Sequence, residues 1–170
     1  GVSSELIAYG GDHVLCSITK EKENEILDKY SLRKEEYSFT VCRIEPENNV
    51  HIVLEAFAHS KRNLLIVGNW EKNEYENYTN IKMLSPIYDI SILNILRSNC
   101  SFYIHGHSAG GTNPSLVEAM FFGKPIIAFD VIYNRETTEN KADYFSSVEE
   151  LERLLSQNRD YYCNSRSMYE

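Results

Sequence analysis

The amino-acid sequence predicts an α/β fold: a doubly wound, mostly parallel sheet of about six strands with helices on both faces. Short, continuous apolar runs bounded by turn residues recur along the chain, as is typical of parallel strands buried on both faces. Amphipathic stretches separate these runs, and this strand–helix alternation favours a parallel sheet. A chain of 170 residues suits one domain with its own core.

The apolar runs place the strands in order along the chain. They predict strands at residues 39–42, 64–67, 81–84, 102–105 and 125–129, with a weaker one at 144–145. A further run at residues 6–9 ends in the turn 10–12 and is hard to assign to the same sheet.

Helices are predicted where apolar residues recur at helical spacing. Val50, Val53, Leu54 and Phe57 follow the i, i+3, i+4, i+7 pattern of a buried stripe. Another helix should begin after Asn113, because asparagine is a good N-cap. The predicted helices are residues 21–30, 49–60, 89–97, 114–122 (Pro114 at its first position, Gly123 as its C-cap), 148–155 and 161–169.

Composition narrows the functional class. The net charge is −8, which disfavours a nucleic-acid partner because binding phosphates needs a basic surface. No apolar run is long enough for a transmembrane segment, and no signal-peptide pattern begins the chain. The cysteines are not paired as C-x-x-C, which predicts reduced thiols in a cytoplasmic protein. They are Cys16, Cys42, Cys100 and Cys163, and Cys42 is expected in the core.

A ligand of such a sheet binds at the carboxyl ends of the strands. Arg43 directly follows the predicted strand 39–42, and its planar guanidinium can hold two phosphate oxygens at once. The alternative is an exposed arginine paired with Glu45 or Glu47, and this segment does not decide between the two.

The segment 105–118 leads from a strand end into a helix. Its glycines allow close backbone approach, and the helix start favours an anion. The alternative is a tight strand-to-helix turn that needs glycine, but the coincidence of the glycine-rich loop with a capped helix start favours the anion site. It matches neither G-x-G-x-x-G nor a phosphate-binding P-loop.

His105 and His107 lack a third metal ligand nearby, so we expect no metal, one histidine in the core and the other in the site. Glu118 must face solvent, the commoner case, or find a partner such as ribose hydroxyls.

The two loops together resemble the C-terminal domain of retaining, two-domain (GT-B) glycosyltransferases of group 1. That family has a strand ending Gly-Arg-Leu, then Pro-Glu-Lys-Gly; residues 42–49 read Cys-Arg-Ile-Glu-Pro-Glu-Asn-Asn. Downstream it has Glu, seven residues, a second Glu, then Ala-Met and Gly-Lys-Pro; residues 118–125 read Glu-Ala-Met-Phe-Phe-Gly-Lys-Pro. The run 105–116, with 133–137, is most similar to bacterial polysaccharide rhamnosyltransferases.

The resemblance implies a Rossmann-like donor domain. Arg43 matches the phosphate arginine, which is also the catalytic residue through its effect on the leaving diphosphate, and Glu118 matches the ribose-binding glutamate. Asn48 stands where the family has its phosphate lysine, and Gly110 where its first glutamate contacts the sugar, so the sugar end is remodelled. The implied donor-binding residues are Arg43, Asn48, His107, Gly110, Gly111, Thr112, Asn113 and Glu118.

The resemblance further implies transfer of a hexose, with rhamnose the expected sugar, from dTDP-rhamnose or a UDP-sugar to a lipopolysaccharide or capsule glycan. The configuration would be retained without a metal. Because the chain begins with Gly1, we expect residues 1–15 to be an interdomain link or the end of a missing acceptor-binding N-terminal domain. Residues 16–170 would be the donor domain of a cytoplasmic enzyme at the inner face of the membrane, acting on a glycan or lipid-linked glycan.

Two alternatives belong to other functional classes. One is a stand-alone nucleotide-binding or regulatory module without catalysis. The other is a dinucleotide-dependent oxidoreductase domain, which the missing G-x-G-x-x-G disfavours.

Overall fold

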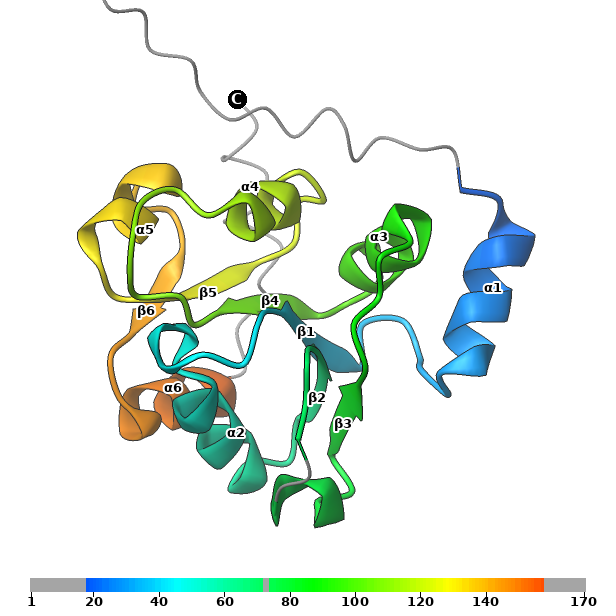
Figure 1. The fold of residues 1–170 in the computed structure, drawn as a ribbon, viewed down its shortest axis with the longest axis horizontal. Helices are drawn as coiled ribbons and strands as arrows, with labels where there is room; N and C mark the ends of the chain where they lie inside the picture. The colour runs from blue at the N-terminus through cyan, green and yellow to red at the C-terminus, as the bar shows by residue number, and fades with distance from the viewer. Residues whose placement is uncertain (1–17, 72–73, 158–170) are drawn as a thin grey trace, which may run out of the picture.

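The computed structural model describes residues 18–71 and 74–157. A six-stranded sheet in the order β3-β2-β1-β4-β5-β6 runs through its centre (Figure 1), and every neighbouring pair is parallel. The predicted fold class is confirmed. The strands are β1 (Tyr37–Val41), β2 (Asn63–Val67), β3 (Ile81–Leu84), β4 (Phe102–His105), β5 (Ile126–Phe129) and β6 (Asp143–Phe145).

Helices follow most strands. They are α1 (Lys20–Lys29), α2 (Val50–Ala58), α3 (Ile90–Ser98), α4 (Pro114–Met120), α5 (Ile132–Thr137) and α6 (Val148–Ser156), with 3-10 turns η2 (Pro46–Asn48) and η3 (Glu74–Asn77). Five of the predicted helices are confirmed to within two residues at each end. Helix α5 was not expected because its short, mostly polar sequence carries no apolar stripe. The predicted strand 6–9, turn 10–12, helix 161–169 and link 1–15 lie outside the described residues.

The sheet separates two hydrophobic cores (Figure 1). Helices α2 and α6 cover one face, and α1, α3 and α4 cover the other. Successive strand residues alternate between them: Phe102 and Ile104 face α2 and α6, whereas Tyr103 lies in the other core. Within the described ranges, no helix is long and apolar enough to cross a bilayer.

Helix α4 starts and stops as its sequence predicts. The Oδ1 atom of Asn113 accepts a hydrogen bond of 3.0 Å from the N–H of Ser115, and Pro114 occupies the first helical position. Gly123 adopts a left-handed φ of 61° after the last turn, which glycine tolerates without a steric penalty.

The loop after β1 and the loop after β4 touch through their backbones. A Cβ added at Gly106 would lie 2.2 Å from the carbonyl oxygen of Asn48, so only glycine fits there. Asn49, itself left-handed with φ 47°, donates its Nδ2 proton to the carbonyl of Gly106 at 2.9 Å. The N–H of Ser108 donates to the carbonyl of Glu47 at 2.7 Å. These contacts bring the two predicted site loops together.

Replacing Gly106 by alanine should destabilise the protein, because the new methyl group meets backbone that cannot move aside. We expect a loss of about 1–3 kcal/mol in the free energy of unfolding, measured by urea denaturation. Gly111→Ala is the matched control, since a Cβ there meets nothing within 4 Å, and its effect should stay within about 0.5 kcal/mol. Equal losses in the two variants would contradict the close approach.

Candidate functional site

A cleft of about 470 Å³ opens at the carboxyl ends of β1 and β4. These two strands are neighbours, and the chain winds outward from them in opposite directions along the sheet. This is the topological switch point, where open α/β sheets bind their ligands. The cleft is lined by Thr40, Val41, Cys42, Arg43, Glu45, Glu47, Asn48, His105, Gly106, His107, Asn113, Pro114, Ser115 and Glu118.

Arg43 is exposed at the end of β1 and lines the cleft. Among the described side chains, no carboxylate forms an ion pair with its guanidinium, so the alternative pairing with Glu45 or Glu47 is not found. Its main chain is held in place, because its carbonyl accepts a hydrogen bond of 2.8 Å from Nδ2 of Asn48. The charged group is therefore available to an anion in the cleft.

Asn48 joins the two site loops. While its Nδ2 binds the carbonyl of Arg43, its Oδ1 lies 2.9 Å from Nδ1 of His107. The amide oxygen only accepts, so Nδ1 carries the proton and Nε2 of a neutral His107 is an acceptor. That Nε2 atom lies 3.9 Å from the place a Cβ would take at Gly110. His107 therefore presents a polar atom toward the glycine-rich segment.

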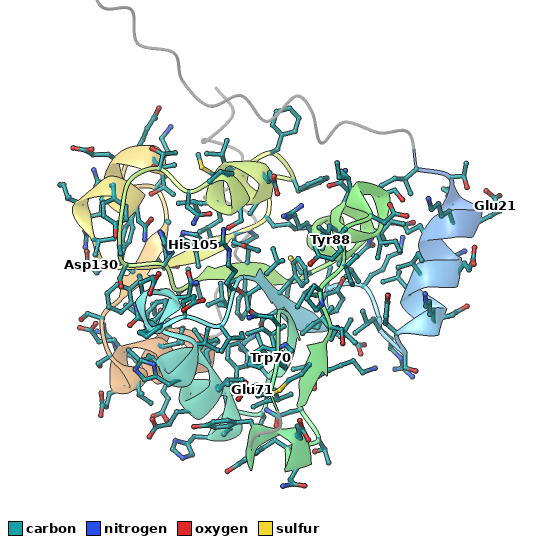
Figure 2. All side chains as sticks on the ribbon, in the orientation of Figure 1. Glu21, Trp70, Glu71, Tyr88, His105 and Asp130 are labelled. Atoms are coloured by element: carbon teal, nitrogen blue, oxygen red, sulfur yellow. The ribbon has the colours of Figure 1, made fainter. Side chains whose placement is uncertain are left out.

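His105 is a buried member of the cleft wall. Figure 2 shows it at the end of β4, on the side of the sheet that faces α4. Burial, helped by the nearby His107, lowers the pKa of His105 to about 3, so the ring is neutral. It stacks on Tyr103 with ring centroids 6.2 Å apart. His105 is thus buried in the cleft wall, whereas the half-buried His107 lines the same cleft. No group of three metal-ligating side chains is found in the described part of the chain.

The glycine-rich segment lies beside the cleft. Gly110, Gly111 and Thr112 are exposed and are not among the lining residues. Asn113 does line the cleft, but its side chain and carbonyl already accept from the N–H groups of the next turn. Pro114 has no N–H. The start of α4 therefore offers an anion fewer free N–H groups than its sequence suggests.

Glu118 does not simply face solvent, which was the commoner expectation for a lone glutamate. Its Oε2 atom lies 2.5 Å from Nη2 of Arg97 in α3, while its side chain remains 20% exposed and lines the cleft. Arg97 was not identified from the sequence. The available signal was a single charge in a helix whose other buried positions are uncharged.

Asn134 in α5 was also not identified. It is fully buried, and its Nδ2 donates to the carbonyl of His107 at 2.9 Å and to that of Phe129 at 3.0 Å. It therefore ties the loop after β4 to the end of β5. Its role depends on a helix that the sequence pattern does not reveal.

Cys42 is a half-buried free thiol in the cleft wall rather than in the interior of the core. Burial raises the pKa of this thiol to about 11. Cys100 is a buried free thiol in the core below α4, whereas Cys16 and Cys163 lie outside the described residues.

Solved structures of glycosyltransferases share this fold. The Anabaena protein Alr3699/HepE in complex with UDP matches with a TM-score of 0.69 and 16% identity, over 89% of this chain and 47% of that chain. A sucrose-phosphate synthase from Thermosynechococcus elongatus matches with a TM-score of 0.65 and 17% identity, over 85% and 43%. The chain thus spans about half the length of these proteins.

A third solved structure is close to this chain in size. The C-terminal domain of a glycosyl transferase group 1 family protein, LpcC from Francisella tularensis, matches with a TM-score of 0.65 and 15% identity, over 88% of this chain and 91% of that chain. Such identities show a common fold. No curated protein sequence matches the chain. The family model for glycosyl transferases group 1 matches residues 22–159, and the chain therefore belongs to that family.

Proposed function

We propose that this chain binds a nucleoside diphosphate sugar and acts as the donor half of a glycosyltransferase. The observation that carries the proposal is the cleft at the switch point between β1 and β4, with Arg43 at one wall and Glu118 at another. Structures with the same fold are complexes with UDP and with UDP-glucose, which supports a nucleotide sugar as the ligand.

Different residues of the cleft contact different parts of the donor. Arg43 binds the diphosphate and stabilises the negative charge that develops on it as the sugar leaves. Glu118 accepts hydrogen bonds from the ribose. The sugar lies toward the second loop, where its contacts come from Asn48, His107, Gly110, Gly111, Thr112 and Asn113.

The finer assignment rests on sequence likeness. The run 105–116 with 133–137 resembles rhamnosyltransferases, and we propose that the sugar is a hexose, rhamnose, transferred with retention from dTDP-rhamnose or a UDP-sugar to a surface polysaccharide. The acceptor would be bound by another domain, with the enzyme in the cytoplasm at the membrane's inner face. The donor would be bound without a metal.

The first test removes the proposed phosphate contact. Arg43→Ala takes away a charge-assisted hydrogen bond, so binding of UDP or dTDP should weaken roughly tenfold to a hundredfold, while binding of the free nucleoside barely changes. Isothermal titration calorimetry measures both. Arg153→Ala, which removes an exposed arginine from α6, is the matched control and should bind like the unmodified protein.

The companion variant Glu118→Gln should weaken nucleoside and nucleoside diphosphate alike, because both carry the hydroxyls that it binds. Thermal unfolding of each variant serves as a control for folding. Unchanged diphosphate affinity in Arg43→Ala, or unfolding of that variant, would make Arg43 a structural residue and move the donor site elsewhere.

Donor binding should not respond to chelators, because the proposed diphosphate contact is the guanidinium of Arg43 and the described residues hold no group of three metal-ligating side chains. The affinity for UDP or dTDP in EDTA should match that in magnesium or manganese within experimental error. Affinity that collapses in EDTA and returns with a divalent ion would refute the metal-independent proposal.

A further inference from the structure

Helix α3 carries an arginine inside the protein. The side chain of Arg97 is 4% exposed and directly follows Ile95 and Leu96, both fully buried. A guanidinium cannot lose its proton at any ordinary pH. Burying one is strongly unfavourable unless an anion compensates its charge. The fold therefore needs a specific reason to keep a charge at this position.

The compensating anion belongs to the cleft. Nη2 of Arg97 lies 2.5 Å from Oε2 of Glu118, and Glu118 is both a lining residue and 20% exposed. The pair connects α3 with α4, which pack on the same face of the sheet. Arg97 lies inside the core, whereas Glu118 reaches the surface of the cleft.

Arg62, which is half-buried, is an arginine whose contacts are purely structural. Arg62 donates from Nε to the carbonyl of Leu155 at 2.5 Å and from Nη2 to that of Gln157 at 3.2 Å. The buried Nε of Arg97, by contrast, donates to none of the described residues. The Nε proton of Arg97 therefore has no partner among these residues, while Nη2 of the same guanidinium contacts Glu118.

We propose that Arg97 is a positioning residue that holds the carboxylate of Glu118 for the sugar ring of a nucleotide. This inference rests on the proposed function, since it assumes that the cleft binds a nucleoside diphosphate. Arg97 itself touches no ligand. It fixes the carboxylate of Glu118 in one position through a charge-assisted contact, so that the remaining oxygen lone pairs are oriented toward the cleft.

The group that such a carboxylate recognises is a hydroxyl donor. An ionised carboxylate has about four lone-pair sites, so it can accept hydrogen bonds from protein groups such as Arg97 and from a ligand at the same time. A phosphate would be repelled there. The 3′-hydroxyl is the donor that ribose and deoxyribose share, so it is the group through which uridine and thymidine nucleotides alike can contact Glu118. Because the pair is largely buried, salt screens it weakly.

The experiment measures how strongly the protein distinguishes a nucleotide from its 3′-deoxy analogue. Calorimetric affinities for UDP and dTDP are each divided by the affinity for the corresponding 3′-deoxy diphosphate. We expect a ratio of roughly tenfold or more for the unmodified protein, typical of a hydrogen bond to a charged group. The ratio should fall close to one in Glu118→Gln and in Arg97→Met, and Arg97→Lys should recover part of it.

A double variant protects the test against misfolding. Arg97→Met leaves Glu118 without its partner and can lose stability, whereas Arg97→Met/Glu118→Gln removes both charges together. If Arg97 acts through Glu118, the double variant has the same hydroxyl ratio as Glu118→Gln alone. Arg62→Met is the matched control: it should lower the melting temperature without changing the ratio.

The outcomes separate the inference from the function on which it rests. If the ratio falls in Glu118→Gln but not in Arg97→Met, or if the double variant differs from Glu118→Gln, Arg97 is structural and the inference is wrong. A ratio that rises in Arg97→Met also overturns it, because the pair would then withhold Glu118 from the ligand. If neither variant changes the ratio although Arg43→Ala weakens diphosphate binding, the ribose is placed wrongly. A protein that binds no nucleotide refutes both proposals.

Discussion

The site depends on one close contact between two backbones, that of Gly106 with the carbonyl of Asn48. It brings the loop after β1 against the loop after β4, and side chains then hold the two together. Asn48 links Arg43 to His107, and Asn49 binds the carbonyl of Gly106. All of these contacts are made between the protein's own groups, so the walls of the cleft are held together by the fold itself.

The sequence predicts most of the fold and several of the residues that line the cleft. Buried strands such as β2 and β4 are visible in the sequence as continuous apolar runs, and α4 is indicated by its cap, proline and terminal glycine. Arg43 and Glu118 were placed in one cleft because adjacent parallel strands end at the same edge. The supporting residues were not predictable in this way. Whether Arg97 meets Glu118, or Asn134 meets the carbonyl of His107, depends on how separate elements pack, and helical periodicity indicates a buried face without naming its partner.

The charge of the cleft differs from what a diphosphate site would suggest. Glu45 and Glu47 line the same cleft as Arg43 and add two negative charges to it, and the charge of Glu118 is compensated by Arg97. Asn48 adds no charge at the position where the family has a lysine. If the cleft binds a diphosphate, as we propose, its affinity must therefore depend on directed hydrogen bonds more than on a surplus of positive charge.

The burial of Cys42 has a consequence for the chemical durability of this cleft. With its pKa raised to about 11, the thiol is almost entirely protonated at neutral pH, and it is the thiolate that reacts with peroxides, disulfides and alkylating agents. A thiolate or sulfinate next to Arg43 would repel the anion that we propose this arginine binds. By keeping the sulfur protonated, the fold lets a cysteine form part of the cleft wall without making that wall a target for oxidation.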